Sequence, residues 1–416
     1  MSRLVILLGL GLLVALVQSE RVRYDNYKIY KVTPRSAAQL DILTRLEGIS
    51  DSLKYFNSAS VIDHPVSILV APHKEPEFLD ILKDNAFEHI LVENNFQRVL
   101  DAEQSELKRS RAGIYDWSSY HTLDETYDWL RSLPDKYPDN VELIVAGKSY
   151  EGRDLLGVKL SFKSGNKAVF IEGGIHAREW ISAATVTYII NQFLTSSNSQ
   201  IRALAESFDW YIVPHVNPDG YVYTHQSDRV WRKTRSKGLL CKGADANRNF
   251  GFHWKEVGAS SIECSETYAG KSAFSEVETQ SLSQFISTLQ GQIYAYISFH
   301  SFSQLMLFPY GHTKEHAPNH NDLQQIGEVA AAALAVRYGT KYTVGNVYDA
   351  IYPASGSSVD WAYGNQGVKL AYTYELRPTS NANNGFVLPA NQIIPTGEET
   401  LDSLVALFQE AKKLGY

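Results

Sequence analysis

The sequence predicts an α/β protein: a mixed, mostly parallel twisted sheet with helices on both faces, preceded by a small α+β open sandwich. Two observations favour this class. From about Gly113 onward, apolar strand-like runs alternate with amphipathic helical patterns, which is typical of a largely parallel or mixed sheet. In addition, 44% of the residues are hydrophobic and 20% are charged, a composition that supplies a core and argues against disorder and coiled coil.

The first unit, residues 20 to about 100, reads strand, helix, strand, helix, strand. Alternating side chains, apolar runs closed by proline and apolar residues at helical spacing indicate these elements in turn. At about 80 residues the unit is near the lower limit for independent folding. We expect strands at 27–32, 66–70 and 90–92, and helices at 40–49 and 78–82.

The second unit runs from about residue 113 to the C-terminus and is long enough for one large domain. Ser275 and Glu278 predict a capping box at the start of one of its helices. In a sheet of this class the ligand site lies at the carboxyl ends of strands. We expect strands at 141–146, 155–162, 168–173, 210–215, 293–300 and 368–376, and helices at 181–194, 276–289, 322–338 and 398–414.

Charge and targeting signals narrow the function classes. The net charge of −7, from 39 basic and 46 acidic residues, argues against nucleic acid as a partner. Residues 1–19 have a charged start at Arg3 and an apolar run, Leu4 to Val17, which predicts a signal peptide cut after Ser19. The alternative is a membrane anchor, but the run is shorter than the ~20 residues that a spanning helix needs. We therefore expect a secreted, extracellular, soluble protein without a membrane partner.

An oxidising destination also bears on the two cysteines. Export makes a disulfide between Cys241 and Cys264 plausible, and the alternative is two buried free thiols. Two cysteines are too few for a disulfide scaffold or a four-cysteine zinc site.

A basic cluster, residues 108–111, lies between the two units. Its sequence Lys-Arg-Ser-Arg is a good tryptic target if exposed, and the alternative is a solvated linker. The exported context favours processing. The expected division is therefore a signal peptide (1–19), an N-terminal unit (20–111, with the cut after Arg109 or Arg111) and a main domain (112–416).

Two histidines and a glutamate predict a metal site. His176 follows an apolar strand, Glu179 comes three residues later, and His300 ends another strand. Two imidazoles and one carboxylate are the donor set of a catalytic zinc that leaves the fourth position for water. His-x-x-Glu alone is weak, and the alternative is a surface ion pair. The absence of His-Glu-x-x-His and Gly-x-Ser-x-Gly argues against thermolysin-type and serine hydrolase sites.

Hydrolysis at such a metal needs a base, and Glu375 is the candidate because it interrupts an apolar strand. The alternative is a structural pair with Arg377. A cationic and polar group suggests recognition of a local carboxylate, and the alternative is that its arginines are ordinary surface residues. The group comprises Arg178, Arg232, Arg235, Asn247 and Arg248.

At this point the sequence resembles the zinc carboxypeptidases of the pancreatic A/B type in proenzyme form. The resemblance covers nearly the whole chain, and several motifs occur in the same order. They are His176-Ala177-Arg178-Glu179-Trp180, Asn217-Pro218-Asp219-Gly220-Tyr221, Trp231-Arg232-Lys233-Thr234-Arg235, Asn247-Arg248-Asn249-Phe250, Ser298-Phe299-His300-Ser301, Ile351-Tyr352, Ser358-Val359-Asp360-Trp361 and Tyr374-Glu375-Leu376-Arg377.

The resemblance implies the following roles. One zinc ion per chain is held by His176, Glu179 and His300, and a water on it is the nucleophile, with Glu375 as general base and then acid. Arg235 polarises the scissile carbonyl. The substrate's terminal carboxylate is bound by Asn247, Arg248 and Tyr352, with Arg178 as a secondary contact. Residues 20 to about 110 are an inhibitory prosegment removed by a trypsin-like protease, and Cys241–Cys264 matches a disulfide of the family.

The resemblance also implies specificity. An aspartate at the floor of the specificity pocket marks B-type enzymes, and this chain has Val359 there. A buried Lys or Arg of the substrate would lack a partner. We therefore expect an A-type enzyme that prefers aromatic and aliphatic C-terminal residues. The other wall positions are Leu307, Gly311, Val347, Ile351, Ala354 and Thr373.

Two departures from the family pattern affect the outer subsites and the Tyr352 loop rather than the reaction. They are Phe302, where tyrosine is frequent, and Pro353, where a longer polar residue is usual.

The predicted function is thus the zymogen of a secreted, monomeric zinc metallocarboxypeptidase that acts on peptide and protein C-termini. Two alternatives are a catalytically silent protein that binds peptide C-termini and a zinc deacylase of N-acyl amino acids. The first would have lost a metal ligand or Glu375, and the sequence keeps them all. The N-terminal unit and its basic junction argue against the second.

Overall fold

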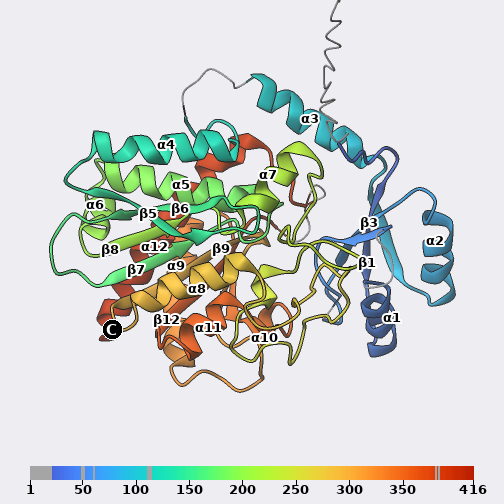
Figure 1. Cartoon of the computed structure of the whole chain (residues 1–416). Helices are drawn as coiled ribbons and strands as arrows, with labels where there is room; N and C mark the ends of the chain where they lie inside the picture. The colour runs from blue at the N-terminus through green and yellow to red at the C-terminus, as the bar shows by residue number, and fades with distance from the viewer. Residues whose placement is uncertain (1–20, 48–51, 60, 110–114, 380–381, 383–384) are drawn as a thin grey trace, which may run out of the picture.

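The computed structural model describes residues 21–47, 52–59, 61–109, 115–379, 382 and 385–416. Two units are visible: a small one at the N-terminus and a large one that contains the rest of the chain (Figure 1). The helix α3 (Phe96–Arg109) runs from the small unit along the edge of the large one. The predicted signal peptide and junction residues 110–114 lie outside the described residues.

The small unit is built on a four-stranded antiparallel sheet in the order β2-β3-β1-β4. Its core buries Val32, Ile68 and Phe78 completely. The prediction of strands and helices in alternation is confirmed, and the short strand β2 was missed. The elements are β1 (Lys28–Thr33), α1 (Ala37–Glu47), β2 (Leu53–Tyr55), β3 (Val66–Val70), α2 (Glu75–Asp84) and β4 (Glu88–Glu93).

The large unit is built on an eight-stranded mixed sheet in the order β11-β10-β12-β9-β7-β8-β6-β5. Its centre, β12-β9-β7-β8, is parallel, as the alternation of strands and helices predicts. The strands are β5 (Val141–Lys148), β6 (Asp154–Leu160), β7 (Ala168–Glu172), β8 (Asp209–Val213), β9 (Ile293–Ser303), β10 (Leu305–Phe308), β11 (Thr343–Asn346) and β12 (Leu370–Thr379).

Helices cover both faces of this sheet, as adjacent residues of β8 show. Trp210 packs against Phe193 of α5 and Phe408 of α12, whereas Tyr211 packs against Phe285 of α8. Because successive strand side chains point to opposite faces, α5 and α12 lie on one face and α8 on the other. The helices are α4 (Leu123–Lys136), α5 (Trp180–Thr195), α6 (Ser199–Ala205), α7 (Pro218–Gln226), α8 (Val277–Thr288), α9 (His320–Tyr338), α10 (Val347–Ala350), α11 (Ser358–Gly364) and α12 (Ile393–Lys413).

The predicted capping box of α8 is wrong. The helix begins after Glu276, and no side chain caps it. The Ser275 hydroxyl donates to the carboxylate of Glu276, and Glu278 instead accepts the backbone N–H of Tyr150 at 3.0 Å. A contact with a distant loop therefore replaces the local one that the spacing predicts.

Glu278 provides a test of pH-dependent stability. Its side chain is fully buried, and burial raises its pKa to about 7. Because folding raises the pKa of this carboxyl, the folded protein becomes less stable relative to the unfolded chain as the pH rises from the pKa of the unfolded state towards 7. Glu278→Gln keeps the acceptor for Tyr150, so we expect the variant to be more stable than wild type by roughly 2–3 kcal/mol at pH 8 and unchanged at pH 4.5. Thermal unfolding at the two pH values measures this, and an equal difference at both would contradict it.

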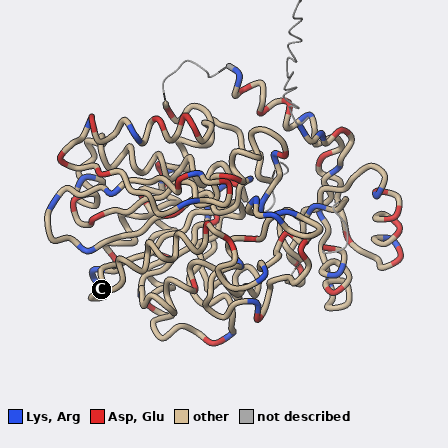
Figure 2. Tube along the Cα trace, viewed as in Figure 1, with Lys and Arg blue, Asp and Glu red and all other residues tan. Residues whose placement is uncertain are grey.

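Basic and acidic residues are interspersed along the chain in both units (Figure 2). Among the residues described, none of the helices combines the length and apolar character that crossing a lipid bilayer requires.

Candidate metal centre

The three predicted metal ligands lie at the carboxyl ends of two neighbouring strands of the large sheet, one on a strand and two in the loop that follows the other. His176 lies in the loop after β7, and Glu179 ends that loop directly before α5. His300 lies on β9, which pairs with β7 in parallel. The site is therefore at the carboxyl end of the central strands, where the fold class predicts it.

Their donor atoms converge on one point. His176 Nδ1 lies 2.8 Å from one oxygen of Glu179 and 3.1 Å from His300 Nδ1, which is itself 3.1 Å from the other oxygen of Glu179. The three side chains are almost completely buried, and their ligand atoms lie within 4.8 Å of one another. Two imidazole nitrogens and a carboxylate packed so closely fit a divalent cation, and this donor set is one of those that bind zinc in catalytic sites.

Asp245 supports the site and was not predicted. One of its oxygens lies 3.0 Å from His176 Nε2, and the other accepts Arg232 Nη2 at 2.8 Å. Burial by itself would raise the pKa of Asp245, but Arg232 and His176 outweigh it and hold that pKa well below the usual range. A carboxylate behind a ligating histidine fixes the ring and its tautomer, so His176 presents Nδ1 to the metal.

Glu375 lies beside the metal site because of strand register. On β12 it pairs directly with His300 of β9. Burial raises the pKa of Glu375 to about 8, although the neighbouring His300 acts to lower it. The alternative pair with Arg377 does not form, because Arg377 binds Glu399 on α12 instead. Glu375 is thus a partly buried carboxylate that lines the cleft, and it has no ion-pair partner among the described residues.

The structure does not bring Arg235 to the site, which corrects the sequence prediction. Its guanidinium carbon lies 3.4 Å from the ring centre of Tyr223 and 4.4 Å from that of Trp231. Arg232 lines the cleft in its place, with Nη1 3.8 Å from Glu179. Both arginines belong to one short irregular segment, and stacking on Tyr223 and Trp231 keeps Arg235 away from the metal ligands.

The predicted carboxylate-binding residues do come together. Asn247 lines the cleft, and its Nδ2 lies 3.5 Å from His300 Nε2. Arg248 is buried and donates to the backbone oxygens of Gly258 and Asn247. Tyr352 lines the cleft as well, with its ring centre 5.4 Å from the guanidinium carbon of Arg248.

Arg178 is buried beneath the small unit rather than free at the entrance. It donates to Glu266 at 3.1 Å and to the backbone oxygen of Tyr55 at 3.3 Å, and it stacks on Phe386. Its predicted contact with substrate would require the small unit to leave.

The predicted pocket walls also gather. Leu307 and Thr373 are direct neighbours across β10 and β12. A Cβ at Gly311 would lie 2.7 Å from the backbone oxygen of Ala354 and 2.9 Å from a methyl group of Val347. Ile351 lines the cleft, and Val359 lies in the first turn of α11. The side chains at these seven positions are apolar or hydroxylic.

The small unit covers the cleft. A cavity of about 290 Å³ is lined by His176, Glu179 and Glu375. Residues of the small unit form one wall of it: Phe56, Asn57, Ser58, Val61, His64, Pro65 and Val66. Buried contacts fix the two units together. Arg229 binds Glu103 of α3 at 2.7 Å, and Tyr24 donates to Asp228 at 2.7 Å.

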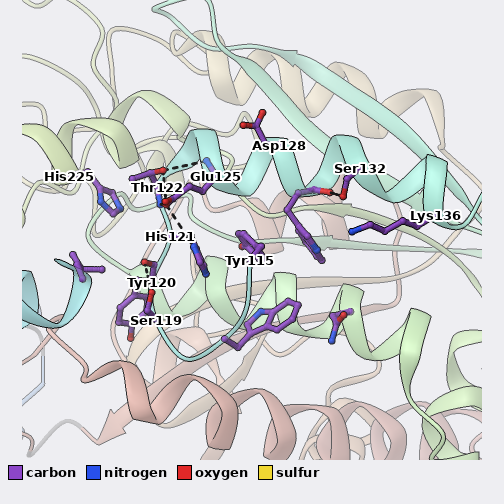
Figure 3. A pocket seen from close by; sticks show the side chains of 14 residues that line it. Tyr115, Ser119, Tyr120, His121, Thr122, Glu125, Asp128, Ser132, Lys136 and His225 are labelled. Atoms are coloured by element: carbon purple, nitrogen blue, oxygen red, sulfur yellow. Dashed lines mark hydrogen bonds and ion pairs between the residues drawn. The ribbon is translucent and has the colours of Figure 1, made fainter. Parts of the chain in front are cut away.

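A larger cavity of about 580 Å³ lies elsewhere, between α4, α5 and the segment before α4 (Figure 3). Aromatic side chains such as Tyr115 and Trp129 line it together with polar residues of α4. It contains none of the three metal ligands, so cavity size alone would point to the wrong place.

The model of the family described as zinc carboxypeptidase matches residues 126–403, and that of the carboxypeptidase activation peptide matches residues 30–103. The chain belongs to the zinc carboxypeptidase family. It is the zymogen of a zinc metallocarboxypeptidase, as predicted, and the His176–Glu179–His300 cluster is compatible with its zinc.

Similar proteins match either nearly the whole chain or about 70% of it. "Zinc carboxypeptidase A 1" of Anopheles gambiae is 57% identical over 96% of this chain and 92% of its own length. "Carboxypeptidase B" of Astacus astacus is 48% identical over 70% of this chain and 96% of its own length. The crystal structure of a carboxypeptidase A from Helicoverpa armigera has a TM-score of 0.87 at 29% identity, covering 95% and 100% of the two chains.

For this zinc carboxypeptidase the small unit is the activation peptide, and its place over the cleft explains how it blocks substrate. The predicted disulfide between Cys241 and Cys264 is present. The silent binding protein and the deacylase are not favoured.

Proposed function

We propose that the chain is secreted as an inactive monomer and that a trypsin-like protease activates it by cutting after Arg109 or Arg111. The mature enzyme then removes aromatic and aliphatic residues from peptide C-termini. The observation that carries the specificity is the pocket wall, which has no charged side chain at any of its seven predicted positions.

The catalytic roles follow from the groups that face the cleft. A bound zinc would polarise the scissile carbonyl and acidify a water molecule. The Glu375 carboxylate takes a proton from the attacking water and later gives it to the leaving amine. Arg232 is placed to donate to the carbonyl oxygen as it gains negative charge, a role that is electrostatic and largest in the transition state.

Restriction to the C-terminus follows from the carboxylate-binding residues. Asn247, Arg248 and Tyr352 offer an amide, a guanidinium and a phenol near the cleft wall. A terminal carboxylate pairs with these donors, whereas an internal peptide bond would leave them unpaired. The same donors therefore favour cleavage at the C-terminus over cleavage at internal peptide bonds.

The names of the relatives do not decide specificity, since both an A-type and a B-type name occur among them. The direct experiment is to activate the secreted zymogen with trypsin and to compare peptides that end in Phe, Leu, Arg and Lys. We expect kcat/KM to be at least tenfold higher for Phe and Leu, because a cation in this pocket has no partner. Faster release of Arg or Lys would refute the A-type assignment.

Val359 gives a prediction of its own. An aspartate at this position places a carboxylate at the pocket floor, so Val359→Asp should shift the preference towards Arg and Lys by at least tenfold. Val359→Asn has the same shape without the charge and is the matched control. The ratio of kcat/KM for Arg and Phe peptides measures the shift. An equal shift in both variants would show that polarity rather than charge is responsible.

A further inference from the structure

A buried carboxylate that the mechanism does not use lies directly below the site. Glu172 is the last residue of β7, and its side chain is fully buried. One oxygen accepts the hydroxyls of Ser298 at 2.8 Å and Ser358 at 2.7 Å. Within the described part of the chain, Glu172 forms no ion pair with Lys or Arg, and its second oxygen has no hydrogen-bond partner.

Strand register places this carboxylate next to the catalytic machinery. Glu172 pairs with Ser298 across β7 and β9, and Ser298 pairs with Thr373 across β9 and β12. The three residues therefore form one row on the same face of the sheet. His176 follows Glu172 by four residues, and His300 follows Ser298 by two, so the row is continuous with the strands that carry metal ligands.

Ser358 connects the row to substrate binding. It is the first residue of α11, and its backbone N–H donates to Asn247 Oδ1 at 2.9 Å. This bond leaves the Nδ2 group of Asn247 as the donor on the cleft side, where it lies near His300. The same helical turn carries Val359.

We propose that Glu172 is a positioning residue for the substrate's terminal carboxylate, a proposal that rests on the assignment of Asn247 to carboxylate binding. By accepting the Ser358 hydroxyl, Glu172 fixes the first turn of α11. The Ser358 N–H in turn holds the Asn247 amide with Nδ2 towards the cleft. One buried acceptor thus ties together the strand that leads to the metal ligands and the helix that orients the clamp.

A matched pair of variants tests this in the trypsin-activated, zinc-loaded enzyme. Ser358→Ala and Ser298→Ala each remove one hydroxyl from the same oxygen of Glu172, so both should lower thermal stability to a similar extent. Only Ser358→Ala removes a hydrogen bond between Glu172 and α11. We expect it to raise KM for a Phe-terminated peptide about tenfold with kcat within twofold, and Ser298→Ala to leave KM within twofold.

Inhibitors separate positioning from a general structural effect. The inhibition constant of L-phenylalanine, which carries the carboxylate, should rise with KM in Ser358→Ala. That of acetohydroxamate, which binds metals without a carboxylate, should not change. Glu172→Gln keeps an acceptor oxygen, so its KM and inhibition constants should stay at wild-type values, whereas those of Glu172→Leu should resemble those of Ser358→Ala.

The outcomes are distinguishable from those for the clamp itself. If Asn247→Ala raises KM but Ser358→Ala does not, or if Ser298→Ala raises it equally, the positioning role of Glu172 is overturned. If Asn247→Ala leaves KM unchanged, the clamp assignment fails, and this proposal fails with it.

Discussion

Replacing Glu375 by glutamine should lower kcat by about 10²–10⁴-fold, the range that a general base contributes. The amide has nearly the same shape as the carboxylate but cannot take a proton from the attacking water. Because Glu375 is not one of the three convergent ligands, zinc content should stay at one per chain. Steady-state kinetics on a Phe-terminated peptide and elemental analysis of the same sample measure both quantities.

The control for this variant is Glu142→Gln on the exposed side of β5, where the same chemical change should leave kcat within twofold. Glu375→Gln with kcat near that of wild type would remove the base from the mechanism. A loss of zinc together with activity would instead place Glu375 among the residues that hold the metal.

The second large effect concerns the two arginines three residues apart. Arg232→Met should lower kcat by about 10²–10³-fold, as expected for removing one donor to the developing oxyanion. Arg235→Met should lower it less than threefold, because that side chain stacks on Tyr223 and Trp231 outside the cleft. Zinc content must be measured in both, since Arg232 also binds Asp245 behind His176.

Either of two results would contradict this assignment. An equal fall in kcat for the two variants would show that the whole segment acts as one structural unit. A larger fall for Arg235→Met would return the role to the residue predicted from sequence, and would require this segment to rearrange when substrate binds.

The sequence predicted most of the sheet because long apolar strands have a clear pattern. Strands β2, β10 and β11 have only three or four residues, too short for a pattern to show. The capping box failed for a different reason: Glu278 has a partner in a loop distant in sequence. The spacing of residues within one segment cannot predict contacts with segments that are distant in the sequence.

The metal ligands were predictable because His176 and Glu179 follow one strand and His300 lies near the carboxyl end of the next, and in this fold class such ends meet at the ligand site. Arg232 and Arg235 occupy an irregular segment, where spacing does not show which side chain turns inward. Asp245 was missed because its role depends on reaching His176, 69 residues earlier in the chain. Its only sequence signal is its position two residues before Asn247.

The direct pairing of His300 and Glu375 has a consequence for how this enzyme tolerates change. Their spacing is set by the backbone ladder between two central parallel strands, about 4.8 Å apart, and not by any loop. A shift of one residue in the pairing of β9 with β12 would turn the Glu375 carboxylate to the opposite face of the sheet, so the register cannot change gradually without losing the site. Surface connections on either side are therefore free to grow, shrink or accept a grafted peptide while the distance between metal ligand and proton acceptor stays constant.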